Sequence, residues 1–161
     1  ASPNAKALLE AERLVLEEGG TVLRFAGLYS LEPGVGSFFL RGGNLQVRPD
    51  RIVSIVSYFD AASAIIKVLD AESPDTLPGQ VFVIADGQDQ SMESIYRSAL
   101  KAGAYTPEGL AAEGMPTFTE RTGDRGKRLD ASKARAALGW APSFKSFDDY
   151  CLHMGGAQKR Q

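Results

Sequence analysis

Short apolar runs alternate with helix-forming segments along this chain, and this alternation most constrains its fold. Residues 21–25, 51–57 and 80–87 are rich in β-branched and aromatic residues and have the length of strands. Residues 4–18, and the segment that begins at Asp60, instead space their apolar residues as a helix does. Because strands that alternate with helices usually form parallel sheets, we predict an α/β fold.

The predicted sheet is thin. The run QVFVIADG, residues 80–87, is apolar almost throughout, which is typical of a strand buried on both faces. Three such strands indicate half of a sheet rather than a complete one. Within strand 21–25, we expect the stem of Arg24 to pack while its guanidinium reaches a carboxylate at the sheet edge. The glycine-rich loop that follows, with Gly27 and Tyr29, fits either a ligand crevice or a plain strand-end turn.

Capping residues predict where the helices begin and end. Gly19-Gly20 should end the first helix, and Asp60 should cap the helix whose apolar face comprises Ala61, Ala64, Ile65, Val68 and Leu69. In the first helix, we expect Leu8, Ala11 and Val15 on the apolar side and Glu10, Glu12, Arg13 and Glu17 on the wetter side. Further helices are expected at 34–42, from Ser91 to about residue 102, at 130–140 between Asp130 and Gly139, and at 143–155. Loops are expected at 73–79 and 103–128. We expect Trp140 to pack the last helices onto the sheet.

Composition excludes several classes of protein. The 161 residues suit one domain, and a net charge of -2 argues against nucleic acid as the main partner. No apolar run reaches the roughly 20 residues of a membrane helix. Cys151 is the single cysteine, which rules out an intramolecular disulfide and a zinc cluster, and it fits a reducing compartment. The opening ASPNAK carries no initiator methionine, so we expect a chain entered in its middle.

Four segments occur in a characteristic order. They are LLEAERLVLEEGGTVLRFAGLYS, IVSYFDAASAIIKVLDA, GQVFVIADGQ and GKRLDASKARAALGWAPSF. In this order they resemble the C-terminal half of extended or atypical short-chain dehydrogenase/reductases, the NAD-dependent epimerase/dehydratase-like proteins. The resemblance covers roughly residues 8–150 and is closest to plant and bacterial members, which suggests a plastid stroma as the location.

The resemblance implies the C-terminal part of a Rossmann-like, doubly wound parallel sheet. Residues 4–72 would belong to that half, residues 73–155 to small helical substrate-domain segments and terminal helices, and residues 156–161 to a tail. The other half would carry a GxxGxxG turn that holds the cofactor pyrophosphate. Neither glycine-rich stretch, at 34–43 or 42–50, follows a strand and opens a helix as that turn requires. The implied partner is therefore the missing half, another protein, or a larger assembly.

The resemblance also implies site residues. A bound NAD or NADP would lie beside Ala26, Gly27, Leu28 and Tyr29, because a glycine lets the backbone approach a ring. A substrate would meet Arg48, Ser57, Tyr58, Lys127 and Arg128, since arginine binds diphosphates through its planar fork. Solvated surface charge and a core tyrosine are the competing interpretations of these residues. Ser57 stands where the family usually has a histidine.

The family's catalytic pair is Tyr-x-x-x-Lys, followed by a glutamate four residues later. Aligning that glutamate with Glu12 places Leu8 at the lysine position and Asn4 at the tyrosine position. Neither side chain titrates as a general base must, so no catalytic residue is predicted. The leading hypothesis is an NAD(P)-binding epimerase/dehydratase-like protein without this dyad; an active member of this kind would use other groups, Tyr29 or Tyr58. The alternatives are a non-catalytic scaffold subunit and a nucleotide-sugar binding module without turnover.

Overall fold

The computed structural model describes residues 2–30, 44–71, 74–102 and 115–158. The helices are α1 (Pro3–Glu17), α2 (Tyr58–Leu69), α3 (Met92–Ala102), α5 (Ser132–Leu138) and α6 (Phe147–Gln158), with a 3₁₀ turn, η2, at Pro74–Thr76. The strands are β1 (Val22–Phe25), β2 (Gly27–Tyr29), β3 (Asn44–Leu45), β4 (Ile52–Val53), β5 (Ile55–Ser57), β6 (Val81–Ile84), β7 (Gln90–Ser91) and β8 (Thr117–Phe118). The helix expected at 34–42 lies outside the described residues.

The central strands pair in parallel, as predicted. β1 pairs with β6 from Val22 opposite Val81 to Phe25 opposite Ile84, and β2 pairs with β5. Two shorter strand pairs are also present: β3 pairs with β8 in parallel, and β4 pairs with β7 in the antiparallel direction. The mixture of helices and parallel strands confirms the α/β class.

The single strand predicted at 51–57 is wrong, because the structure divides it at Ser54. The Ser54 hydroxyl donates to the carbonyl of Lys127 at 3.0 Å and accepts the N–H of Leu129 at 3.1 Å. These contacts bind the chain to a distant loop rather than to a neighbouring strand. β4 on one side then pairs with β7, while β5 on the other side pairs with β2.

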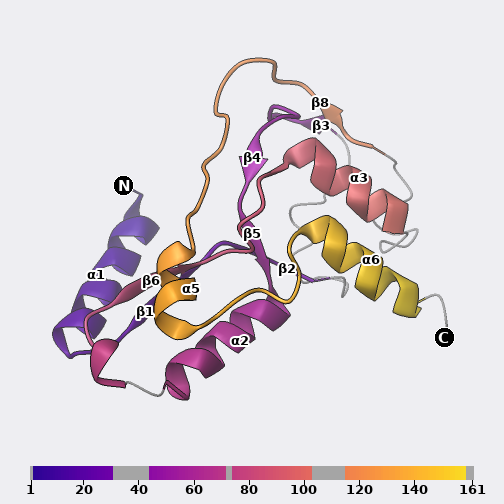
Figure 1. The fold of residues 1–161 in the computed structure, drawn as a ribbon. Helices are drawn as coiled ribbons and strands as arrows, with labels where there is room; N and C mark the ends of the chain where they lie inside the picture. Colours follow the sequence, from indigo (N-terminus) through magenta and orange to yellow (C-terminus); the bar gives the residue numbers. More distant parts are fainter. Residues whose placement is uncertain (1, 31–43, 72–73, 103–114, 159–161) are drawn as a thin grey trace.

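Two apolar clusters form the core. The first surrounds β1 and β6 and includes the fully buried Phe82 and Trp140, the latter after α5. The second lies where α3 and α6 pack together and includes Ile95 and Phe147. Figure 1 shows these two parts side by side, with α1, α2 and α5 around one and α3 and α6 in the other. The expected packing role of Trp140 is confirmed, since its Nε1 also donates to Ser63 Oγ at 3.0 Å.

Several helix boundaries follow the predicted caps. Gly19 and Gly139, both with positive φ, follow the ends of α1 and α5. Ser91 Oγ accepts the N–H of Ser94 at 3.1 Å, which confirms it as the cap of α3. The last helix begins at Phe147 rather than at residue 143, because Ser146 Oγ accepts the N–H of Asp149 at 3.1 Å and forms a cap there.

Two predicted caps are wrong. α2 is capped by Ser57, whose Oγ accepts the N–H of Asp60 at 2.9 Å, so Asp60 lies inside the first turn. The cap position of α5 is Ala131, one residue after Asp130. The Asp130 carboxylate still accepts the N–H of Ser132 at 2.8 Å from outside the helix. In α2, the nearby Ser57 caps the helix in place of Asp60. In α5, the cap position lies one residue later than predicted.

Helix α1 lies on the surface and buries none of its residues. Glu12, expected on its wetter side, instead faces β1 and pairs with Arg24, with Nε and Oε1 2.9 Å apart. This pair confirms that Arg24 reaches a carboxylate. Leu8 and Val15, expected to be apolar contacts, are 68% and 42% exposed.

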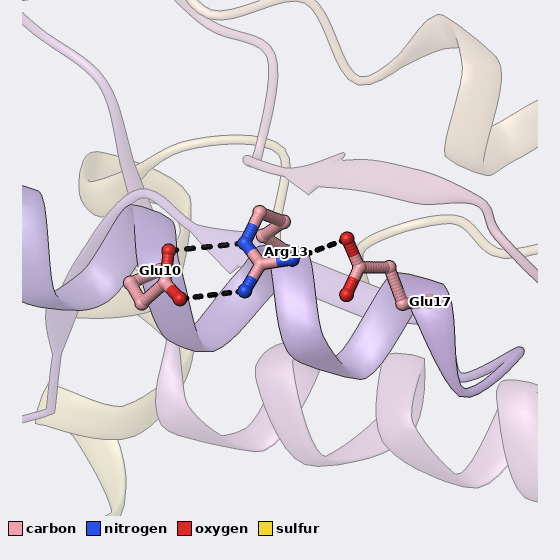
Figure 2. A network of polar contacts seen from close by, with 3 residues as sticks. All are labelled: Glu10, Arg13 and Glu17. Carbon is pink, nitrogen blue, oxygen red and sulfur yellow. Dashed lines mark hydrogen bonds and ion pairs between the residues drawn. The ribbon is translucent and has the colours of Figure 1, made fainter.

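The opposite face of α1 carries a chain of ion pairs. Arg13 donates to Glu10 through Nε and Nη2, at 3.0 and 2.7 Å, and also pairs with Glu17 (Figure 2). Hydrogen bonds from this guanidinium lower the pKa of Glu10. All three side chains are at least half exposed, so the network marks the solvent face of the helix rather than fixing its position.

The apolar faces predicted for α2 and β6 are only partly buried. In α2, Ala61 and Ala64 face the core, whereas Ile65 and Leu69 are 43% and 76% exposed. In β6, residues alternate between buried and half-buried positions, so the expectation of full burial on both faces is wrong. The described part of the chain therefore leaves apolar surface uncovered on its sheet side. Within it, no helix has both the length and the apolar character to span a bilayer.

Candidate functional site

The site lies where the chain changes neighbours between β1 and β2. The Ala26 N–H donates to the carbonyl of Ile84 at 2.9 Å, and the Gly27 N–H donates to that of Ser54 at 3.1 Å. Successive N–H groups in a strand point to opposite sides, so β6 lies on one side of this point and β5 on the other. In parallel α/β sheets, ligands bind outside the carboxyl ends of the strands, and Ala26 and Gly27 directly follow the carboxyl end of the parallel pair β1–β6.

The four residues predicted to meet a cofactor differ in accessibility. Gly27 and Leu28 are half-buried, which leaves them room to contact a ligand, whereas Ala26 is buried. Tyr29 is only 3% exposed and packs edge-on against Phe147 and against another ring of α6, each with ring centroids 5.1 Å apart. The loop predicted at Gly27 and Tyr29 is wrong, because residues Gly27–Tyr29 form strand β2, paired with β5. This strand leaves Gly27 and Leu28 half-buried and Tyr29 buried. Their role as cofactor ligands stays a prediction.

Ser57 and Asp60 connect α2 to the segment before α6. The Ser57 hydroxyl donates to Asp60 Oδ2 at 2.9 Å, and both residues are essentially inaccessible. Asp60 also accepts the N–H groups of Ser143 and Phe144, at 2.6 and 3.3 Å. The Ser57 side chain is therefore occupied within the fold, while the neighbouring Tyr58 is 45% exposed.

The three basic residues predicted to meet a substrate lie on different segments. Arg48 forms a two-pronged pair with Asp50, at 2.7 and 2.6 Å, and its guanidinium lowers the pKa of that carboxyl. Arg128 pairs with Asp89 at 3.0 Å, in the turn after β6. Lys127 is exposed beside Arg128. The structure brings Lys127 and Arg128 near the β6 turn, and places Arg48 beyond β3.

Sequence reasoning missed the buried polar residues of the turn 86–90. Asp86 and Gln90 are 3% and 8% exposed, and the Gln90 amide lies 3.5 Å from the Asp86 carboxyl. Burial raises the pKa of Asp86 to about 7, opposed by the N–H groups of Gln88 and Gly87 and assisted by the charge of Asp60. An aspartate directly after a continuous apolar strand is the signal that would have found it.

Two cavities border this turn. One, of about 280 Å³, is lined by Gly87, Asp89 and Arg128, and the other, of about 360 Å³, is lined by Gln88 and Gln90. A third, of about 380 Å³, lies between the ends of α2 and α5, away from the strand ends. The turn 86–90 therefore lines both of the cavities at this end of β6.

The described residues offer little acid–base chemistry at this site. Asn4 and Leu8 are both exposed on α1, and burial raises the pKa of the Tyr29 hydroxyl, which therefore stays protonated. Burial likewise raises the pKa of the Cys151 thiol to about 12. Among the residues that the structure describes, no cluster of histidine, cysteine or acidic side chains could hold a metal ion. Asp86, with its pKa raised to about 7, is a described group that could exchange a proton near neutral pH.

Comparison with known proteins gave matches among solved structures alone. No family model and no curated protein matches the chain. A dTDP-glucose 4,6-dehydratase from Bacillus anthracis in complex with NAD has a TM-score of 0.71 at 15% identity, covering 100% of this chain and 53% of its own. A short-chain dehydrogenase/reductase superfamily protein from Agrobacterium tumefaciens with bound NAD has a TM-score of 0.73 at 12% identity, covering 99% and 58%.

A third structure agrees with these two. The UDP-glucose 4-epimerase from Thermotoga maritima with UDP-glucose has a TM-score of 0.64 at 19% identity, covering 94% of this chain and 50% of its own. The chain thus spans about half the length of the solved structures that it matches. At these identities the likeness establishes the fold, which is the Rossmann-like fold of short-chain dehydrogenase/reductases.

Proposed function

We propose that this chain is the C-terminal half of an NAD(P)-binding, epimerase/dehydratase-like protein. The observation that carries the proposal is the Rossmann-like fold, in which residues 26–29 directly follow the carboxyl end of the parallel pair β1–β6. Two of the matched structures hold NAD, and each is about twice as long as the part that matches. A plastid location belongs to the same proposal and rests on the plant-like sequence alone.

The residues of the segment 26–29 fit one end of a dinucleotide. Gly27 and Leu28 would lie against the nicotinamide ring, which in this fold class carries the hydride chemistry. Arg128 and Lys127 would meet the phosphates of a nucleotide-linked substrate. A second half of the sheet would hold the pyrophosphate, since no described glycine turn leads from a strand into a helix in the required way. Turnover is not part of the proposal, because Asn4 and Leu8 replace the dyad.

One surface favours an alternative in which the chain is a non-catalytic subunit of a larger complex. Among the described strands, β1 pairs with β6 alone, so its other edge is open. Apolar side chains are exposed on both helices next to this sheet, at Leu8, Leu9, Leu14 and Val15 of α1 and at Tyr58, Phe59, Ile65, Ile66 and Leu69 of α2. Such a surface needs a covering partner. A second half of the sheet and a separate protein subunit would both satisfy it.

Binding is tested on the natural full-length protein by titrating NADH and NADPH and following the cofactor fluorescence. We expect saturable binding that Gly27→Val weakens, because the added side chain occupies the crevice. Ala136→Val, on the exposed face of α5, serves as the matched control and should leave binding unchanged. An unaltered signal at millimolar cofactor counts against the cofactor proposal.

The coding sequence and the oligomeric state separate the two functions. A GxxGxxG segment encoded upstream supports the cofactor-binding protein, and its absence excludes it, since this chain then lacks a pyrophosphate site. Gel filtration and co-purification address the subunit. Recovery in a large complex supports the subunit, whereas a clean monomer contradicts it.

A further inference from the structure

A polar cavity lies where three segments meet: the turn 86–90 with β7, helix α3 and the start of helix α6. Its volume is about 360 Å³, which falls within the range of roughly 300–1,000 Å³ typical of small-molecule sites. Every residue that lines it has a polar or charged side chain, among them Gln90 of β7, Ser98 of α3 and Asp148 of α6. A cavity of this composition offers a ligand hydrogen bonds rather than apolar contact.

Gln90 is nearly inaccessible, yet its side-chain amide is poorly satisfied. The residue is 8% exposed, and the pairing of β7 with β4 fixes its backbone opposite Val53. Its amide nitrogen donates to Asp86 Oδ2 at 3.5 Å, which is long for a hydrogen bond. Its carbonyl oxygen accepts no hydrogen bond from any described residue. Because an unpaired amide is costly to bury, this side chain has hydrogen-bonding capacity for a ligand in the cavity.

Asp148 supplies a carboxylate whose position is fixed by a hydroxyl. Ser98 Oγ donates to Asp148 Oδ1 at 2.8 Å, and Ser98 itself is 9% exposed. This bond joins α3 to α6, the two helices that lie side by side in Figure 1. Asp148 is half-buried, and its second oxygen, Oδ2, accepts no hydrogen bond within the described part of the chain. One carboxylate oxygen is therefore left for a donor in the cavity.

The other charges in the lining are already paired. Arg97 pairs with Glu93 at 2.6 Å, and Asp89 pairs with Arg128 at 3.0 Å. An anion in the cavity would therefore face the Asp148 carboxylate without a free cation to hold it. A metal ion would need a cluster of ligating side chains, and the described residues form none. The remaining groups suit hydroxyls, because a hydroxyl can both donate to a carboxylate and accept from an amide.

We propose that this cavity is a binding site for a small uncharged polyol, such as a single sugar ring, with Gln90 and Asp148 as its hydrogen-bonding groups. One hydroxyl of the ligand donates to Asp148 Oδ2. Neighbouring hydroxyls donate to the Gln90 carbonyl and accept from its amide. None of the lining residues is among the cofactor or phosphate contacts proposed above, so the inference goes beyond the proposed function and does not depend on it.

The test is a nuclear magnetic resonance titration of the natural full-length protein with myo-inositol, an uncharged ring with a hydroxyl on every carbon. No cofactor is added. We expect saturable shifts of the Gln90 side-chain amide and of the backbone amides around Ser98 and Asp148. Cyclohexanol, a ring of the same size with a single hydroxyl, should leave these resonances unchanged, because it cannot reach both groups at once.

Two substitutions of similar size test the two hydrogen-bonding groups separately. Asp148→Asn replaces the charged acceptor by a neutral amide, and Gln90→Met removes the amide while keeping the length of the side chain. Each should weaken inositol binding about tenfold, the ratio expected when hydrogen bonds of this strength are lost. The matched control is Asp149→Asn in the same helical turn, because that carboxylate already accepts the N–H of Lys145 at 3.0 Å. Its affinity for inositol should be unchanged.

Several results would overturn the proposal. These are the absence of shifts around the cavity at high-millimolar inositol, equal shifts with cyclohexanol, and unchanged affinity in either folded variant. Binding of tetramethylammonium or inorganic phosphate in place of inositol would also overturn it, since the site would then take an ion. If Gln90→Met does not fold, Asp148→Asn decides alone, because it keeps an acceptor for Ser98. Because no cofactor is present, this result and that of the NAD(P) titration can fail separately.

Discussion

Removing the Asp60 carboxylate should be among the most damaging single changes that the structure identifies. The side chain is 0% exposed and accepts hydrogen bonds from Ser57 Oγ and from the backbone N–H groups of Ser143 and Phe144. It therefore holds the start of α2 against the segment that leads into α6. Asp60→Ala leaves the buried Ser57 hydroxyl without this acceptor, and it also removes the acceptor of two N–H groups on the partly exposed segment before α6.

The size of the effect follows from these contacts. Each of the three hydrogen bonds that Asp60→Ala removes contributes about 0.5–1.5 kcal/mol net, so we expect a loss of roughly 1.5–4.5 kcal/mol. Asp60→Asn keeps one acceptor oxygen, and we expect about 1–3 kcal/mol, since one donor then faces an amide N–H₂. Asp75→Ala, at an exposed aspartate of η2, is the control and should lie within about 0.5 kcal/mol of the unmodified protein.

Urea denaturation followed by circular dichroism measures these differences. The order of stability should be unmodified protein, then Asp60→Asn, then Asp60→Ala. A loss below about 1 kcal/mol for Asp60→Ala would show that solvent or other groups replace the carboxylate, and the reasoning from these three hydrogen bonds would be refuted.

Three further predictions concern other parts of the fold. Gly126→Ala should lower the melting temperature sharply, because a Cβ there would lie 1.9 Å from the carbonyl oxygen of Ile52; a melting temperature within a degree or so of the original contradicts the geometry. Glu12→Gln should speed amide exchange in α1, because it breaks the pair with Arg24, and equal rates would mean that the pair does not dock the helix. The free energy of unfolding should fall as the pH rises from about 4 to 7, because the folded state keeps a proton on Asp86 that the unfolded state has lost. The pKa raised from 3.8 to about 7 sets an upper bound of about 4 kcal/mol on this fall. Urea midpoints that are independent of pH in this range would contradict the prediction.

The parts of the fold that were predictable depend on local pattern. The parallel strands follow from runs of β-branched residues. The helix ends at Gly19 and Gly139 follow from glycine's tolerance of positive φ. Both signals lie in residues that are close together in the sequence. The division of strand 51–57 at Ser54 was not predictable, since it depends on hydrogen bonds to a loop more than 70 residues away. The spacing of apolar residues also failed to predict which side of α1 is exposed, because Glu12 faces β1 and pairs with Arg24.

The candidate site was predictable to a similar extent. The resemblance located the segment 26–29, and its position directly after the carboxyl end of the parallel pair β1–β6 gives it a structural reason. The burial of Asp86 and Gln90 could be found only from the fold, because it depends on packing against segments that are distant in the sequence. A polar residue at the end of a buried strand has no periodic signal of its own.

The most direct test of the account is a crystal structure of the natural full-length protein grown with NAD⁺. We predict cofactor density with its nicotinamide end against Gly27 and Leu28, and a further parallel strand on the open edge of β1. Density for NAD⁺ elsewhere, with the segment 26–29 in contact with protein alone, would contradict the central claim that this chain supplies one side of a dinucleotide crevice.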